Sequence, residues 1–385
     1  MSSAPGRPAW RLPRRDLVLL PLISLGTLLL IVGLAEIASR VIWPAYTEGS
    51  CLVSDARVGF KWKPNCDARV KIMESSPAVY HFNECGFRAS RPCRTKPPGT
   101  LRIASLGSSS MLGYWVATDE VLPELLASEL ARRCGRAAES QNLSVPGATL
   151  YDMQHRLDEV IALQPDVVLL GISSQDLIDT LPEEPLHAPD FPAGSTRPSL
   201  GARLKEILHQ ANLNSRFVAV VRHYLYLDRE RYIQSMFRRG DDVAMQKPLG
   251  SLWEKRLAVA DQTLAGISDR LRTAGVPLVV IYFPALTELQ VIKAGREYPD
   301  LDPYDIESRL GQMARRDGIV FVSSLRFLAQ TSDPTVYFFA GDGHLSGTGH
   351  RRLAEAALQS LSLVRTGSLP CAAAVATTSS DRLPQ

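Results

Sequence analysis

The sequence carries little net charge and lacks the common metal-binding patterns. Its 385 residues have a formal charge of +3 at pH 7, and no basic stripe interleaved with aromatic residues is present, so nothing indicates nucleic-acid binding. None of its six cysteines forms a Cys-x-x-Cys pair, and no group of cysteines and histidines has the spacing of zinc ligands. An internal repeat is also absent, which argues against a repeat architecture. We therefore expect neither a metal site nor a nucleic-acid partner.

The composition is otherwise ordinary for a globular protein. Hydrophobic residues make up 45% of the chain and charged residues 22%, which permits a core of normal size. The length suits one large domain, or one domain with a small extra region.

A long apolar run lies near the N-terminus. Residues 17–35 carry no charge, and as a helix they would span roughly 28 Å, close to the ~30 Å hydrocarbon core of a bilayer. Four arginines precede the run: Arg7, Arg11, Arg14 and Arg15. The pattern predicts an uncleaved membrane helix over residues 16–38, with residues 1–15 in the cytoplasm and the rest of the chain outside, in the periplasm. The alternative is a signal peptide cleaved after residues 33–35, which sends the chain to the same compartment.

Four of the six cysteines precede residue 94, in a lead-in segment (residues 39–98) that is rich in proline and aromatic residues. An exported location permits disulfides, and we expect one or two of them to stabilise this segment. Free, half-buried thiols are the alternative, and spacing does not determine the connectivity. The cysteines are Cys51, Cys66, Cys85, Cys93, Cys134 and Cys371.

Strands alternate with helices over residues 99–364. Short segments between the helical patterns predict strands at residues 101–106, 140–145, 166–171, 276–283 and 319–323, and residues 166–171 are strongly apolar. Helical patterns fall at residues 120–133, 150–163, 252–274, 304–316 and 347–362. This alternation is typical of an α/β domain whose parallel sheet is covered by helices on both faces.

The alternation breaks over residues 181–250. Residues 181–200 are rich in proline, whereas residues 200–238 have the amphipathic pattern of helices and carry several aromatic residues. A long insertion beside the carboxyl end of a strand is often a lid over the active site, and a packing helix that touches no substrate is the alternative. Residues 365–385 are mostly small and polar, which predicts a disordered tail.

A serine-rich turn follows the first strand of the α/β domain. The sequence Gly107-Ser108-Ser109-Ser110 would place the Ser109 hydroxyl at the carboxyl edge of the sheet, where open α/β folds bind their ligands. Backbone N–H groups at the start of the next helical turn could stabilise an anion there. Serine alone is a poor nucleophile, so Ser109 requires a base.

The candidate base lies just before the last predicted helix, in Asp342-Gly343-His344. A carboxylate two residues before a histidine, on a short loop, can orient the imidazole and stabilise its protonated form. His350 competes for the role of base, but it falls inside the following helix, so we interpret it as structural.

Two strand ends supply hydrogen-bond donors. Gly147 follows the strand predicted at residues 140–145, and its bare backbone N–H can approach a substrate oxygen closely. Gln175 follows the strand at residues 166–171 and carries a side-chain amide. Both positions suit donation to an oxyanion.

These pieces, in this order, resemble the SGNH (GDSL-like) hydrolase family. Residues 107–113 resemble the family's first block, Gly-Asp-Ser-x-x-x-Gly, with Ser108 in place of the aspartate. Residues 145–149 resemble the second block, in which Gly147 is the oxyanion glycine. Gln175 takes the asparagine position of the third block, Gly-x-Asn-Asp.

The resemblance continues at both ends of the domain. Residues 342–350 resemble the fifth block, although the Asp-x-His spacing is one residue shorter than the family's commonest Asp-x-x-His. Residues 82–88 resemble an Asn-x-x-Gly-Phe-Arg sequence found in membrane-anchored relatives. The similar region covers roughly residues 82–362.

The resemblance implies a three-layer α/β/α domain with a mostly parallel five-stranded sheet, and a serine esterase that needs no metal or organic cofactor. Ser109 would attack an ester carbonyl, His344 would take and return the proton, and Asp342 would hold His344. The N–H groups of Ser109 and Gly147 and the amide of Gln175 would hold the oxyanion. Some extracytoplasmic members of the family add or remove acyl groups on polysaccharides, so we expect an ester-bearing small molecule or glycan as substrate.

Two other functions stay open at this stage. An O-acyltransferase acting on an extracytoplasmic polysaccharide would use the same three residues, and only the acceptor of the acyl group would differ. A non-catalytic binding partner that kept the fold is the second alternative, and the glutamine at position 175 is the main feature in its favour.

Overall fold

The computed structural model describes residues 13, 15–55, 58–178, 180–181, 215–240 and 242–362. The predictions for most of the basic N-terminus, for residues 182–214 of the 181–250 insertion and for the 365–385 tail therefore lie outside the described residues. Two units are distinguished, one made of residues 1–44 and 197–221 and the other of residues 45–196 and 222–385.

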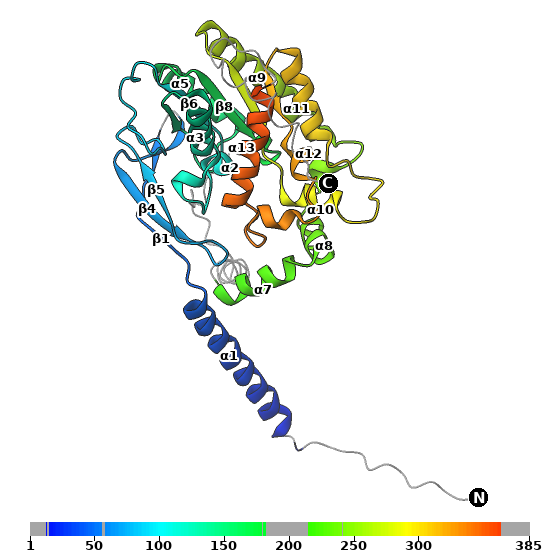
Figure 1. Cartoon of the computed structure of the whole chain (residues 1–385). Coiled ribbons are helices and arrows are strands. Elements are labelled where there is room, and N and C mark those ends of the chain that lie inside the picture. The colour runs from blue at the N-terminus through cyan, green and yellow to red at the C-terminus, as the bar shows by residue number, and fades with distance from the viewer. Residues whose placement is uncertain are drawn as a thin grey trace, which may run out of the picture. The chain divides into compact units, whose positions relative to one another are not determined.

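A sheet of five parallel strands forms the centre of the second unit (Figure 1). The strands lie in the order β10-β9-β8-β6-β7, and each neighbouring pair is parallel. This confirms the predicted five-stranded sheet. Strands β6, β8 and β9 are buried throughout, which explains why the sequences of β8 and β9 are apolar runs. The strands are β6 (Leu101–Leu106), β7 (Ala138–Asn142), β8 (Val167–Ile172), β9 (Leu278–Tyr282) and β10 (Val320–Val322).

Helices cover both faces of the sheet, as the predicted three-layer fold requires (Figure 1). On one side α3 packs against α13, which also contacts α12; on the other, α9 contacts α4, α5 and α11. The α-helices are α1 (Asp16–Ile42), α2 (Ser109–Leu112), α3 (Leu122–Cys134), α4 (Leu150–Gln154), α5 (Leu157–Ala162), α7 (Arg216–Tyr226), α8 (Arg229–Arg239), α9 (Ser251–Thr273), α10 (Leu286–Ile292), α11 (Asp305–Arg316), α12 (Ser324–Leu328) and α13 (Gly347–Ser362).

The single helix predicted over residues 150–163 is wrong, because the chain divides there into α4 and α5. Thr149 caps α4 by accepting a hydrogen bond from the N–H of Asp152. At the bend, the buried guanidinium of Arg156 turns inward, where it donates to the carbonyl of Leu143 and to Glu159. The break thus ties the helical layer to the segment that leads to Gly147.

The lead-in segment adds two small antiparallel sheets before β6. Strand β4 (Cys66–Lys71) pairs with β1 (Tyr46–Glu48) and with β5 (Ala78–Phe82), and β2 (Leu52–Asp55) pairs with β3 (Gly59–Trp62). Two disulfides, Cys51–Cys66 and Cys85–Cys93, cross-link this segment, and Cys134 is disulfide-bonded as well.

Arg88, in the Phe82–Arg88 sequence, is fully buried and holds the chain that follows α2. Its guanidinium donates to the carbonyls of Leu112, Gly113 and Val116. It also lies 4.0 Å from the centre of the Tyr80 ring, in a cation–π contact. One side chain therefore donates hydrogen bonds to three carbonyls that have no partner within the helix.

Replacement of Arg88 by alanine should lower the free energy of unfolding by about 3–5 kcal/mol, because it leaves several buried carbonyls without donors. Chemical denaturation measures the change. Arg91 is exposed, and Arg91→Ala should stay within about 0.5 kcal/mol of wild type. Equal losses for the two variants would show that the buried guanidinium does not stabilise this turn.

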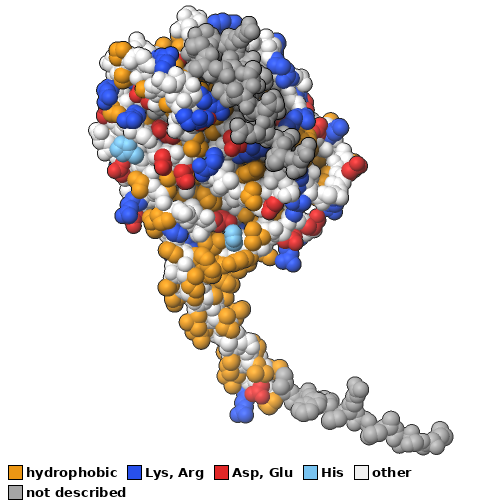
Figure 2. All heavy atoms as spheres, viewed as in Figure 1, with side chains coloured by type: hydrophobic (Ala, Val, Ile, Leu, Met, Phe, Trp, Pro, Cys, Tyr) orange, Lys and Arg blue, Asp and Glu red, His pale blue; other side chains and the backbone are white. Residues whose placement is uncertain are grey.

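Helix α1 belongs to the first unit and is long and apolar enough to cross a membrane. It has 27 residues, its most apolar window has a mean hydropathy of 2.6, and none of that window is buried. Hydrophobic side chains cover its visible surface (Figure 2). Near its end, Glu36 accepts hydrogen bonds from the Ser215 hydroxyl and from the N–H groups of Arg216 and Phe217, which caps the first turn of α7.

Candidate active site

Ser109 is the first residue of α2, two residues after a sharp turn at the end of β6. The turn requires Gly107, since a Cβ atom there would lie 2.4 Å from the Cβ of Met111. Asn142, at the end of β7, donates from its amide to the carbonyl of Met111 and so fixes α2 to the sheet edge. The serine is thereby placed at the carboxyl edge of the sheet, as predicted.

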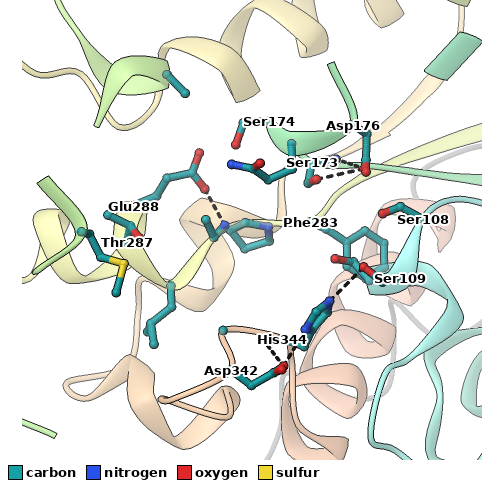
Figure 3. Close-up of a pocket in the computed structure, with 18 of the residues that line it drawn as sticks. Ser108, Ser109, Ser173, Ser174, Asp176, Phe283, Thr287, Glu288, Asp342 and His344 are labelled. Atoms are coloured by element: carbon teal, nitrogen blue, oxygen red, sulfur yellow. Dashed lines mark hydrogen bonds and ion pairs between the residues drawn. The ribbon is translucent and has the colours of Figure 1, made fainter. Parts of the chain in front are cut away.

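His344 and Asp342 lie on the loop before α13 and meet Ser109 there (Figure 3). The Nε2 atom of His344 is 2.9 Å from Ser109 Oγ, and its Nδ1 atom is 2.6 Å from Asp342 Oδ1. A carboxylate accepts only, so Nδ1 carries the proton and Nε2 is left to accept from the serine hydroxyl. The structure therefore brings together Ser109, His344 and Asp342, although 235 positions separate the serine from the histidine.

The charge of Asp342 is maintained by its neighbour. Burial alone would raise the pKa of this carboxyl, but the hydrogen bond and the charge interaction with His344 outweigh burial and hold the pKa below its ordinary value. Asp342 is thus ionised at neutral pH and can stabilise a protonated imidazole.

The loop that carries His344 is fixed from two directions. Phe339 closes it by donating its N–H to the carbonyl of His344 and accepting from the N–H of Gly343, at 2.9 and 2.6 Å. Glu74, which is half-buried, accepts from the N–H of Gly341 at 3.0–3.1 Å and also contacts His223 of α7. Sequence reasoning missed Glu74, because no local pattern connects it with a loop 267 residues away.

Gly147 and Gln175 both line the same pocket as Ser109 and His344. Gly147 adopts a φ of +70°, in the left-handed region that favours glycine, and a Cβ there would meet no atom within 4 Å. Conformation rather than crowding therefore selects glycine. Gln175 begins the short helix η2 (Gln175–Leu177), is exposed, and forms no hydrogen bond through its side chain among the described residues. Its amide is free to meet a substrate.

Asp176 supports the turn on which Ser109 sits (Figure 3). Its buried carboxylate accepts from the N–H and the hydroxyl of Ser173, at 2.7 and 2.9 Å, and interacts with the hydroxyl of Ser108. Burial raises the pKa of Asp176 to about 6 despite these hydrogen bonds. The prediction did not give Asp176 or Ser108 a role, although both occupy positions of the family's blocks.

The pocket at this site has a volume of about 650 Å³. Beyond the residues already placed, its lining includes Arg222 and Tyr226 of α7, Met236 of α8 and Leu286 of α10. In the part of the chain that the structure describes, no group of three or more histidine, cysteine and acidic side chains could hold a metal ion.

His350 lies in α13, is 1% exposed, and uses its Nδ1 atom to accept from the N–H of Leu122 at 3.3 Å. Burial lowers its pKa from 6.5 to about 3, and the nearby charge of Arg88 adds to this effect. The ring is therefore neutral in the folded protein and caps the start of α3.

This low pKa predicts a pH-dependent stability that His350→Gln should remove. The unfolded chain binds a proton near pH 6.5 and the folded chain only near pH 3, so protonation favours unfolding. The contribution of neutral His350 is complete above pH 6.5 and is lost as the pH falls toward 3. Between pH 7 and about pH 5, wild type should lose about 2 kcal/mol relative to His350→Gln in denaturation experiments. Parallel pH profiles would contradict a buried neutral ring.

A model of the GDSL-like lipase/acylhydrolase family matches residues 105–352, more than half of the chain. The chain belongs to the GDSL-like lipase/acylhydrolase family. The region shared with the family runs from β6 into α13, and so contains both segments that meet at Ser109 and His344.

Solved structures with a similar fold include TesA, at 16% identity over 68% of this chain and 97% of that one, with a TM-score of 0.37. A lipase/acylhydrolase from Enterococcus faecalis has 14% identity over 68% and 95% of the two chains, with a TM-score of 0.39. A variant of Axe2, an acetylxylan esterase from Geobacillus stearothermophilus, has 15% identity over 68% and 93%, with a TM-score of 0.37. No curated protein sequence matches the chain.

Proposed function

We propose that this member of the GDSL-like family is a serine esterase in which Ser109 is the nucleophile, His344 the general base and Asp342 the carboxylate that orients it. The observation that carries the proposal is the position of His344, whose two ring nitrogens contact Ser109 and Asp342 at 2.9 and 2.6 Å. Such a chain of hydrogen bonds activates a serine hydroxyl that is otherwise a weak nucleophile.

The proposed reaction has two half-reactions. Ser109 Oγ bonds to the ester carbonyl carbon while its proton moves to His344 Nε2, and collapse of the tetrahedral intermediate expels the alcohol with that proton. Water then attacks the acyl-serine, gives its proton to His344, and the acid leaves as Ser109 Oγ regains the proton. Asp342 stabilises the imidazolium in both halves. An acceptor hydroxyl in place of water would make the same site an acyltransferase.

The negative oxygen of each tetrahedral intermediate needs donors that are already in place. We assign the backbone N–H groups of Ser109 and Gly147 and the side-chain amide of Gln175 to this role. All three residues line the pocket beside His344, and the Gln175 amide forms no competing hydrogen bond among the described residues. Donors fixed before the reaction stabilise the transition state more than the bound substrate.

Removal of the amide in Gln175→Ala should lower kcat by roughly 100-fold with little change in KM, because the hydrogen bond strengthens in the transition state. Steady-state kinetics with an aryl ester tests this. Gln175→Asn restores the usual family residue and should keep at least part of the activity. A kcat within about twofold of wild type for Gln175→Ala would remove Gln175 from the oxyanion site.

The esterase activity itself is tested with the full chain in detergent and short-chain aryl esters. Hydrolysis that is inhibited by a serine-reactive fluorophosphonate supports the proposal. Mass analysis of added glycans distinguishes an acyltransferase, which would transfer the acyl group to sugar. A pure, folded preparation that turns over no ester and is not labelled would instead support a binding protein that retains the fold.

We further propose that α1 anchors the chain with the esterase domain on the extracytoplasmic, periplasmic side. The length and hydropathy of α1 and the arginines before it support this arrangement. Protease added to spheroplasts should degrade the domain and spare the basic N-terminus. Release of a soluble chain that begins near Glu36 would show a cleaved signal instead.

A further inference from the structure

Arg222 brings an unused positive charge to the catalytic pocket. It lies on α7, is half-buried, and lines the pocket together with Tyr226 of the same helix. Within the described ranges, the Arg222 side chain takes part in no hydrogen bond and no ion pair. A guanidinium has five N–H donors in a planar fork, so Arg222 has its donors available to a molecule in the pocket.

None of the acidic residues that the structure describes in the pocket lining forms an ion pair with Arg222. Asp342 is paired with His344, and Asp176 is occupied by Ser173 and Ser108. The third acid among the described residues of the lining, Glu288, is buried, and its carboxyl contacts the Tyr282 hydroxyl and the Ala285 N–H at the start of α10.

Glu288 contributes little negative charge that could offset Arg222. Burial raises the pKa of Glu288 to about 8, so it is mostly neutral at pH 7. A second arginine, Arg239 of α8, lines the same pocket and contacts the sulfur of Met236. Arg222 therefore has no ion-pair partner among the described residues of the pocket lining.

We propose that the pocket binds an ester whose acyl or alcohol part carries a carboxylate or a phosphate, and that Arg222 recognises this anion. This inference rests on the proposed esterase function and specifies its substrate class. The guanidinium fork matches two oxygens of either anion, and apolar side chains of the same lining, such as Met236 and Leu286, lower the local polarity and strengthen the interaction. A pocket of about 650 Å³ has room for an acylated sugar acid or sugar phosphate as well as the reacting ester.

Matched ester pairs test this selectivity and locate the anion. For the acyl side, mono-para-nitrophenyl adipate is compared with para-nitrophenyl hexanoate. For the alcohol side, acetylated methyl glucuronoside and an acetylated glucoside phosphate are compared with acetylated methyl glucoside. We expect a higher kcat/KM for the charged member of at least one pair, and the pair that shows it distinguishes the acyl side from the alcohol side and carboxylate from phosphate.

In Arg222→Ala, this preference should fall by roughly tenfold to a hundredfold, the effect of losing one charge-assisted hydrogen bond, while kcat/KM for the neutral esters changes little. Arg222→Lys keeps the charge and should retain part of the preference. Arg238 is exposed, lies on α8 outside the pocket lining, and gives a matched control, since Arg238→Ala removes the same charge. Equal kcat/KM values within every pair, or an unchanged preference in Arg222→Ala, would overturn the inference while leaving the esterase proposal intact.

Binding provides a readout that does not depend on turnover. Calorimetry should show glucuronate, glucose phosphate or adipate binding to the Ser109→Ala protein, and Arg222→Ala in that background should weaken it by a similar factor. Absence of binding by all three anions would count against the site. Absence of hydrolysis of every ester, charged or neutral, would instead count against the proposed function.

Discussion

Replacement of Ser109 by alanine should reduce ester hydrolysis at least about a thousandfold and leave the fold unchanged. The hydroxyl is the only group proposed to bond to the substrate carbon, so its loss removes the acyl-enzyme route and leaves binding and oxyanion donors alone. In the described structure its side chain forms a hydrogen bond only with His344, so the free energy of unfolding should change by less than about 1 kcal/mol. Steady-state kinetics and denaturation of the same preparation measure the two effects.

Two neighbouring serines make the assignment specific. Ser110 also lines the pocket, and Ser108 interacts with Asp176. Ser110→Ala should keep most activity, and a fluorophosphonate should label Ser109 in wild type but nothing in Ser109→Ala. Labelling that moves to Ser108 or Ser110, or an active Ser109→Ala protein, would show that the turn presents a different nucleophile.

The sequence was most informative where local chemistry decides structure. Strand β8 is buried on both faces and therefore appears as an apolar run, and both β6 and β8 were predicted within one residue. Local geometry requires glycine at position 107, where a Cβ atom would clash, and favours it at position 147, where φ is positive. Both glycines are therefore visible as signals in the sequence. The family resemblance gave the order of the blocks, and the structure brings Ser109, His344 and Asp342 together.

Long-range polar contacts were beyond the sequence. Two such contacts join Glu74 to Gly341 and Asp176 to Ser108. In neither pair does the sequence around one residue indicate that the other is its partner. The division of α4 from α5 likewise depends on Arg156. Its side chain points inward because its guanidinium donates to the carbonyl of Leu143, and a periodic pattern does not predict that contact. Such contacts follow from how elements pack, and periodicity reports only which face of an element is buried.

The packing around His344 bears directly on its proposed role. Its ring lies 5.0 Å from that of Tyr114, at an interplanar angle of 50°, and Glu74 fixes the loop through the N–H of Gly341. The Asp342 carboxylate, the Tyr114 ring and the loop backbone that Glu74 fixes therefore hold the imidazole in place. A base positioned this closely needs little rearrangement when substrate binds, which is a condition for efficient proton transfer.

Substitution of His344 by alanine should reduce kcat about as severely as Ser109→Ala, because the serine proton then has no acceptor. The double variant should be no slower than either single one, since residues that act as a unit do not add. Asp342→Asn tests the orienting carboxylate. Its amide can donate to the ring where the carboxylate only accepts, so it favours the wrong tautomer and should lower kcat by about a thousandfold or more.

The histidine assignment needs controls that keep the fold. His155 is an exposed histidine whose ring contacts the carbonyl of Tyr151, and His155→Ala should leave kcat unchanged. His350→Gln should retain most activity, because glutamine can still accept from the N–H of Leu122. If His350→Gln were inactive in a folded protein and His344→Ala active, the base would lie in α13. If His344→Ala and Ser109→Ala lowered kcat by independent factors that multiply in the double variant, the two residues would not form one proton-transfer unit.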